Sequence, residues 1–321
     1  MAEVNGNRIT RTAVLMTCEC DDKTMRALEE KYDLYPLWKS RNKEEFIAAN
    51  AHTVRAIVTR GDLGADGALI RAIPHLEIIA CYGVGTDAID LAAARERGVR
   101  VTNTPDVLVG DVADLGIGLA LAIMRNIPAA DEFVRSSQWG RHSMPLVRRF
   151  FGCNLGIVGF GKIGRNIAKR AAAFDAVVGY FDVTRNADSP LQFFPTLVNL
   201  AAWSDVLMVT LSGGESTRGL IDRNVLDALG PSGFLVNVSR GSVVDETELL
   251  AALEANRIGG AGLDVFWHEP EIDRRFLKLT NTVLQPHHAS ATLETREEMG
   301  RLVCANLSAH FAHQKLVTPV L

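Results

Sequence analysis

The chain has 321 residues, a length typical of two domains that each bury a core of their own. Hydrophobic residues make up 47% and charged residues 22%, which excludes an intrinsically disordered chain. The 34 basic and 38 acidic residues give a net charge of −4, so the composition offers no strongly basic surface for a phosphate backbone. Nucleic acid is therefore not expected as a partner.

Neither a membrane span nor a secretory signal is predicted. The longest apolar run, residues 115–124, has about half the length that a spanning helix needs. The N-terminal segment stays polar and charged up to Thr12, unlike a signal peptide. Five cysteines are scattered along the chain, and Cys18-x-Cys20 is too closely spaced for a zinc-binding pair. We therefore expect reduced thiols, no metal site and a cytoplasmic protein.

In the first third of the chain, short β-branched or apolar runs alternate with helical patterns. Strands are expected at residues 13–17, 54–59, 77–82 and 99–102, and helices at residues 22–31, 43–51, 65–73 and 90–97. This alternation predicts a parallel sheet with helices on both faces. A long helical region follows from about residue 111 to residue 137. It is interrupted near Pro128, since proline cannot continue an uninterrupted helix.

The alternation resumes at Leu155. Strands are expected at residues 155–158, 176–181, 206–210, 234–238, 262–265 and 282–284, and helices at residues 164–174, 197–203, 223–229, 246–256 and about 293–312. The sequence therefore predicts an α/β protein with two doubly wound parallel-sheet domains. The second region has enough strands for a full dinucleotide-binding Rossmann fold.

A glycine-rich turn with the pattern G-x-G-x-x-G lies between the strand at 155–158 and the helix that follows it. Its first glycine, Gly159, permits a tight turn, Gly161 lets the backbone approach a pyrophosphate, and Gly164 allows close packing of helix on strand. Asp182 closes the next strand 23 residues after Gly159, where a carboxylate can accept hydrogen bonds from a ribose 2′-hydroxyl. The pattern predicts NAD as cofactor. NADP is the alternative, because a mobile Arg185 could reach a 2′-phosphate.

A second glycine turn, Gly83-Val84-Gly85, also follows a strand, and Asp106 likewise lies 23 residues after Gly83. Asp106 stands beyond Pro105, and the residue before a proline favours an extended conformation, so the chain is already leaving the sheet there. We interpret Gly83–Gly85 as a backbone nest for a small carboxylate. The spacing alone leaves a plain tight turn as the alternative.

Six segments carry a family resemblance. They are CYGVGTDAID (81–90), VTNTPDVLVGDVADLGIGLAL (101–121), LGIVGFGKIG (155–164), NVSRGSVVDE (237–246), AGLDVFWHEP (261–270) and QPHHASAT (285–292). Together they resemble the D-isomer-specific 2-hydroxyacid dehydrogenase family, most of all its glyoxylate, hydroxypyruvate and phenylpyruvate reductases. The resemblance implies a Rossmann cofactor domain (104–290) inserted into a flavodoxin-like substrate domain (1–103 and 291–321). It also implies a homodimer in which the helices of residues 111–137 cross between subunits and bury the apolar run 115–124.

The resemblance further implies NAD(P)H-dependent reduction of a small 2-keto acid to the D-2-hydroxy acid, with hydride delivered to C2. This reaction needs a cation for the carboxylate, an acid that titrates near neutral pH, and a partner for that acid. Arg240, Glu269 and His287 match the family's positions for these roles. Arg240 would bind the substrate oxygens with its planar fork, His287 would donate the proton, and Glu269 would hold the imidazolium. His288 and His268 are expected to be structural or solvated.

Further ligand contacts follow from the same resemblance. The implied substrate-binding residues are Val84, Gly85, Arg240 and His287. The implied cofactor-binding residues are Gly159, Phe160, Gly161, Lys162, Ile163, Gly164, Asp182, Ser212, Val238, Ser239, Arg240, Asp264, His287 and Ser290. Asp264 would contact the nicotinamide end of the cofactor. The chain departs from the common pattern at Ser212-Gly213-Gly214, where many relatives carry a proline.

Two other functions share parts of this pattern. Co-repressors that act as NAD-dependent scaffolds keep the three catalytic residues, but the chain shows none of their extensions or a peptide-docking signature. Formate dehydrogenases pair their histidine with glutamine, whereas this chain has Glu269. The substrate side-chain pocket is expected to come from several loops, including residues 137–150 with Trp139, Met144 and Leu146, and its shape cannot be read from sequence.

Overall fold

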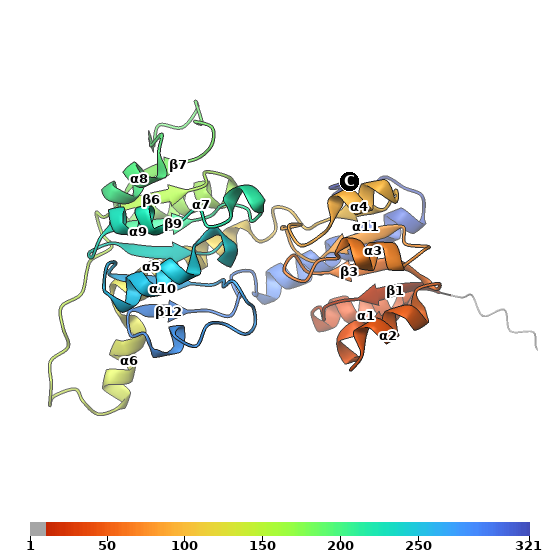
Figure 1. The fold of residues 1–321 in the computed structure, drawn as a ribbon, viewed down its shortest axis with the longest axis horizontal. Helices are drawn as coiled ribbons and strands as arrows, with labels where there is room; N and C mark the ends of the chain where they lie inside the picture. Colours follow the sequence, from red (N-terminus) through yellow and green to blue (C-terminus); the bar gives the residue numbers. More distant parts are fainter. Residues whose placement is uncertain (1–10) are drawn as a thin grey trace, which may run out of the picture. The chain divides into compact units, whose positions relative to one another are not determined.

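The computed structural model describes residues 11–321, which divide into two compact units (Figure 1). The first unit comprises the chain up to Val107 together with Thr292–Leu321, and the second comprises Leu108–Ala291. The junctions expected from the sequence are 103/104 and 290/291. The prediction about a signal peptide falls on residues 1–10 and so lies outside the described residues.

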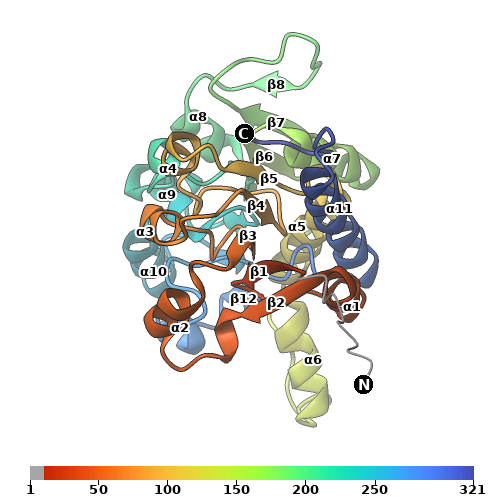
Figure 2. The ribbon, with the colours of Figure 1, turned by 90° about the vertical axis from the view of Figure 1, so that its right-hand side faces the viewer.

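The first unit is built on a five-stranded parallel sheet with the order β2-β1-β3-β4-β5, which is the flavodoxin-like order. Its strands are β1 (Thr12–Met16), β2 (Tyr32–Pro36), β3 (Val54–Thr59), β4 (Ile78–Cys81) and β5 (Arg100–Thr102). In Figure 2, one face of the sheet is covered by α1 (Asp22–Lys31) and α11 (Leu293–Phe311). The other face is covered by α2 (Lys43–Asn50), α3 (Gly67–Ala72) and α4 (Leu91–Glu96).

The second unit is a seven-stranded parallel sheet with the order β12-β11-β10-β9-β6-β7-β8, a Rossmann order extended by one strand. Its strands are β6 (Asn154–Val158), β7 (Val177–Phe181), β8 (Gln192–Phe193), β9 (Val206–Val209), β10 (Phe234–Asn237), β11 (Gly260–Leu263) and β12 (Thr282–Leu284). One face carries α5 (Val109–Met124) and α7 (Lys162–Ala171), and the other carries α8 (Leu197–Trp203), α9 (Arg223–Leu229) and α10 (Glu246–Glu254) (Figure 2). The predicted fold class is confirmed.

The observed helices and strands differ from the predicted ones mainly at one helix break and at two edge strands. The long helical region breaks at Arg125 and Asn126, and α6 (Ile127–Arg135) begins at the next residue with Pro128 in its first turn, where the missing N–H is tolerated. Two edge strands, β2 and β8, were not predicted. The first contains a proline and the second has only two residues, so neither shows a recognisable strand pattern.

The apolar run at residues 115–124 lies in α5, which packs against α7 and against β10, β11 and β12. Ile117, Leu119, Ala120, Ile123 and Met124 are buried within this unit. The other side of the run, with Leu115, Leu121 and Ala122, is only half-buried within the chain, and its burial by a second subunit stays a prediction. Among residues 11–321 no single helix is long and apolar enough to cross a membrane. α5 and α6 pass that test only as a pair, bent by 58°.

Residues 127–151, here called the α6 arm, lead away from the sheet of the second unit along α6 and then return to it (Figure 1). At the return, the Arg148 N–H donates to the Met124 carbonyl at 3.1 Å and Phe150 is buried. The arm consists of α6 and a mostly irregular segment after it. Its apolar side chains include Trp139, which is 77% exposed, and Leu146, which is fully exposed. Large apolar side chains without cover on an extended segment favour a contact with another protein surface.

Candidate active site

The predicted ligand-binding residues of the second unit lie just beyond the ends of its strands. Gly159 follows β6, Asp182 follows β7, Arg240 lies three residues after β10, Asp264 follows β11, and His287 lies three residues after β12. Because the strands are parallel, these residues share one edge of the sheet. Asp182 and Asp264 are four strands apart, roughly 19 Å at about 4.8 Å per strand. The order of the strands reverses between β6 and β9, which is where such sheets bind ligands.

The three glycines of the G-x-G-x-x-G turn have different physical reasons to be glycine. Gly159 has a φ of +94°, and a Cβ added to Gly164 would lie 2.3 Å from the Gly159 carbonyl oxygen, so the fold requires both. Gly161, at the N-cap of α7, has an ordinary φ of −74°, and a Cβ added there would meet no atom within 4 Å. The chain itself does not need glycine at position 161. The open space before the helix N-terminus fits a pyrophosphate group.

Asp182 is fixed in the place expected for a ribose contact. Its Oδ2 accepts a hydrogen bond from the Phe160 N–H at 2.7 Å, and its Oδ1 accepts one from the Val183 N–H at 2.7 Å. The Phe160 ring stacks on Tyr180 with 4.2 Å between ring centroids, which holds the turn against β7. Each carboxylate oxygen keeps a further lone pair for a hydroxyl donor.

Arg240 belongs to a turn that is organised by Asn237, the almost completely buried last residue of β10. The Asn237 Oδ1 accepts hydrogen bonds from the N–H and the hydroxyl of Ser239, both at 3.0 Å, and its Nδ2 donates to the Arg240 carbonyl at 2.9 Å. The next residue, Gly241, packs so closely that an added Cβ would lie 2.0 Å from the Phe266 carbonyl carbon. This contact brings the Arg240 turn against the segment that follows β11.

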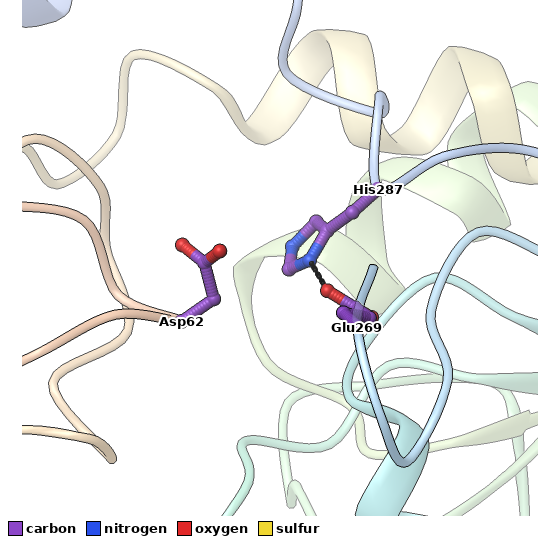
Figure 3. Close-up of side chains that lie close together, drawn as sticks. All are labelled: Asp62, Glu269 and His287. Atoms are coloured by element: carbon purple, nitrogen blue, oxygen red, sulfur yellow. Dashed lines mark hydrogen bonds and ion pairs between the residues drawn. The ribbon is translucent and has the colours of Figure 1, made fainter. Parts of the chain in front are cut away.

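His287 and Glu269 form a direct pair. The His287 Nδ1 and the Glu269 Oε2 are 2.6 Å apart, and Figure 3 shows the imidazole ring turned toward the carboxylate. The other carboxylate oxygen, Oε1, accepts a hydrogen bond from the Phe266 N–H at 2.8 Å, so the carboxylate is oriented by its own loop. An ionised carboxylate can only accept, so Nδ1 carries the proton of the pair and Nε2 is left to exchange a proton with a ligand.

Asp264 supports the loop that carries His287. Its carbonyl accepts from the His287 N–H at 2.8 Å, and its carboxylate accepts from the His288 N–H at 2.6 Å and the Ala289 N–H at 3.1 Å. These bonds hold His287 at a φ of 53°, which is uncommon for a residue other than glycine. Burial raises the pKa of Asp264, while the N–H bond from His288 and the charge of His287 act against that shift. The cofactor contact expected for Asp264 remains a prediction.

The remaining predicted residues lie near this edge but form no single cluster. Val238 and Ser239 are buried after β10, Ser212 is exposed after β9, and Ser290 is half-buried after the His287 loop. Lys162 and Ile163 form the first turn of α7. The His268 ring lies beside Trp267 with 6.4 Å between centroids, and the side chain of His288 is exposed.

In the first unit, the turn at residues 83–85 follows β4 at the carboxyl edge of that sheet. Within residues 11–321 neither the Val84 N–H nor the Gly85 N–H has a hydrogen-bond acceptor. Adjacent N–H groups without protein acceptors are what an anion-binding nest offers. The turn is therefore able to bind a small carboxylate, and that role stays a prediction.

The hydrogen bonds by which Asn237 and Asp264 hold the loops of Arg240 and His287 were not predicted from the sequence. A signal was available, because each is a polar residue at the end of a buried apolar strand, where an unpaired polar group is costly. The pattern predicts that such a side chain is hydrogen-bonded, but it does not reveal the partner.

Comparison with known proteins gives a consistent result. The family described as D-isomer specific 2-hydroxyacid dehydrogenase, NAD binding domain, matches residues 117–289. A glyoxylate/hydroxypyruvate reductase A of Arabidopsis thaliana is 45% identical over 308 residues, covering 96% of this chain and 98% of that protein. A 2-ketogluconate reductase of Gluconobacter oxydans is 47% identical over 294 residues, covering 92% and 94%.

A solved structure of similar sequence extends the comparison to the whole fold. It is the NADPH-dependent glyoxylate/hydroxypyruvate reductase of Sinorhizobium meliloti in complex with NADP and malonate. The TM-score is 0.87 at 37% identity, and the match covers 97% of each chain.

The different environments of Gly161 and Gly164 give a test of the cofactor site. Gly161→Ser places a favourable N-cap residue in open space, so the thermal midpoint should stay within about 2 °C of the wild type. NADH affinity should fall at least about tenfold, because the new side chain occupies the pyrophosphate space. Gly164→Ser is the matched control and should lower the thermal midpoint itself, since the added Cβ collides with the Gly159 carbonyl. Unchanged NADH binding by titration of the Gly161 variant would contradict the assignment.

Proposed function

Because the chain belongs to the D-isomer-specific 2-hydroxyacid dehydrogenase family, we propose that it reduces a small 2-keto acid to the D-2-hydroxy acid with a nicotinamide cofactor. The observation that supports this most is the His287–Glu269 pair at 2.6 Å, on the sheet edge that also carries Arg240 and the G-x-G-x-x-G turn. Substrates of the glyoxylate, hydroxypyruvate or phenylpyruvate type fit the names of the relatives. A formate dehydrogenase or a co-repressor scaffold is not favoured, since the proton donor is paired with a glutamate and the relatives are reductases.

Each candidate site residue has a separate role in the proposed reaction. When bound, the nicotinamide supplies the hydride that reaches C2 of the keto acid. As negative charge develops on the carbonyl oxygen, His287 donates a proton from Nε2, and Glu269 stabilises the imidazolium beforehand. Arg240 binds the carboxylate with its guanidinium fork and polarises the carbonyl group. In the first unit, the N–H groups of Val84 and Gly85 are a candidate carboxylate-binding group.

A spectrophotometric assay tests the reaction class. NADH oxidation at 340 nm is measured with glyoxylate, hydroxypyruvate and phenylpyruvate, and NAD reduction is measured with formate. Turnover of at least one 2-keto acid and none of formate is expected. Activity on formate alone, or on none of these compounds, would overturn the proposal.

Substitution of the proton donor gives the second prediction. His287→Ala should lower kcat by roughly 10²–10⁴ because the general acid is lost, while NADH binding persists. His288→Ala is the neighbouring control and should leave kcat within about twofold of the wild type, since among residues 11–321 the hydrogen bonds of His288 involve only its backbone N–H and carbonyl. A larger loss in the His288 variant would show that the proton donor is assigned to the wrong residue.

Arg240→Lys tests the carboxylate-binding role. Lysine keeps the charge but loses the planar fork, so KM for the keto acid should rise, kcat should fall, and kcat/KM should drop roughly 10- to 100-fold. Arg223→Lys, at an exposed ion pair with Asp227, is the control and should leave both parameters unchanged. An unchanged KM in the Arg240 variant would mean that another group binds the carboxylate.

The choice of nucleotide depends on Asp182. A carboxylate fixed by the Phe160 N–H accepts a ribose hydroxyl and repels a 2′-phosphate, so we propose NAD over NADP. One such repulsion costs on the order of 1–4 kcal/mol. We expect kcat/KM with NADH to exceed that with NADPH at least about tenfold. Asp182→Ser should narrow this ratio mainly by improving NADPH, and Asp188→Ser, in an exposed loop, should not. Equal use of both cofactors by the wild type would contradict the proposal.

We further propose that the protein is a homodimer and that the α6 arm adds exposed contact surface to the half-buried side of α5. The arm carries Trp139 and Leu146 in solvent. Light scattering at micromolar concentration should give twice the chain mass of 34.9 kDa. Trp139→Asp combined with Leu146→Asp should shift the mass toward the monomer, and Leu277→Asp, at another exposed leucine, should not. A wild-type mass of one chain would refute the dimer.

A cytoplasmic location is the last part of the proposal. All five cysteines lie in the described part of the chain and are free thiols, and four of them are buried. Unpaired cysteines are typical of proteins that remain in a reducing compartment.

A further inference from the structure

The turn at residues 83–85 is held through its carbonyl groups by donors from outside the turn. The Gly83 carbonyl accepts a hydrogen bond from the Thr104 N–H at 2.9 Å, and the Val84 carbonyl accepts one from the side-chain Nδ2 of Asn103 at 2.9 Å. In a trans peptide the N–H points opposite to the carbonyl of the same peptide. The N–H groups of Val84 and Gly85 therefore point away from residues 103 and 104.

A third contact continues this pattern. The thiol of Cys81 donates to the Gly85 carbonyl at 3.4 Å, so the N–H of Thr86 is also turned away from the group that holds its peptide. Within residues 11–321 none of the N–H groups of Val84, Gly85 and Thr86 has an acceptor. Among the three donors to this turn, Asn103 alone offers a side-chain amide, and its bond fixes the peptide between Val84 and Gly85.

Asn103 itself is rigidly placed. Its N–H donates to the Thr318 carbonyl at 3.3 Å, and the Thr318 hydroxyl donates to the Asn103 carbonyl at 2.6 Å. Thr318 is held in turn by Asn306, which is almost completely buried: the Asn306 Oδ1 accepts from the Thr318 N–H at 3.1 Å, and its Nδ2 donates to the Thr318 hydroxyl at 2.8 Å. The Asn103 side chain therefore extends toward the turn from a main chain that is fixed on its other side.

We propose that Asn103 is a positioning residue for the substrate carboxylate. By holding the Val84 carbonyl, its amide orients the Gly85 N–H toward the position that the carboxylate occupies. A neutral amide suits this place, because it donates to a carbonyl without adding a negative charge beside an anionic ligand. The inference rests on the proposed function and adds to it a residue that does not touch the substrate.

Two variants separate this role from a purely structural one. Asn103→Leu removes the donor at nearly constant volume, and Asn103→Asp replaces the donor by an acceptor. In both, KM for the best 2-keto acid should rise roughly three- to tenfold, as loss of about one hydrogen bond predicts, while kcat and KM for NADH stay within about twofold. The inhibition constant of oxamate, an isostere of a 2-keto acid, should rise in parallel.

The control is Asn50→Leu, which removes an equivalent amide-to-carbonyl bond, to Phe46 at 2.7 Å, on α2 of the same unit. It should leave all kinetic constants unchanged. Unchanged KM and oxamate inhibition in the Asn103 variants of an active enzyme would overturn the inference and leave the proposed function intact. A lower melting temperature with an equal loss of NADH and keto-acid binding would also overturn it, in favour of a structural role. A wild type that reduces no 2-keto acid would instead reject the proposed function.

Discussion

Backbone groups just beyond the end of a parallel strand have no partner in the sheet, and each one that is buried has to be satisfied by another group. In the second unit, side chains at the strand ends meet this need. Asp182 accepts from the Phe160 N–H, Asn237 binds the turn before Arg240, and Asp264 accepts from the two residues after His287. The same edge that lacks regular hydrogen bonds also holds the candidate site. The same side chains therefore satisfy the backbone hydrogen bonds of these loops and orient the candidate site residues that the loops carry.

The supports differ in how much they constrain the reactive groups. Asp264 is engaged through both its carbonyl and its carboxylate, and it holds His287 in a left-handed conformation that the chain would not adopt freely. Glu269 is oriented by one N–H of its own loop and by the imidazole. The geometry of His287, the proposed proton donor, thus depends on a buried acid. Such indirect supports resemble the outer-shell partners that orient ligands in metal sites.

Motifs formed by residues close together in the chain could be predicted from the sequence. Contacts between residues far apart in the chain could not. The G-x-G-x-x-G turn was recognisable because strand, glycines, helix and Asp182 follow each other within a short stretch. Arg240, Glu269 and His287 were identified through a family resemblance, and the structure brings the last two into contact. The bond between Asn103 and Val84 could not be anticipated, since Thr318, which braces Asn103, lies 215 positions away in the chain. The apolar pattern of α5 likewise cannot distinguish burial under its own sheet from burial under a partner.

The first unit is assembled from both ends of the described chain, and this affects the order in which the protein can fold during synthesis. α11 packs on β4 and α1, Gly300 lies against Thr24, and the Tyr82 hydroxyl donates to the Arg296 carbonyl. All of Leu108–Ala291 is translated before α11. In the emerging chain, the part of the first sheet that α11 covers therefore stays uncovered until α11 has been translated. Apolar surface that is transiently exposed in this way makes a partly folded chain prone to aggregation.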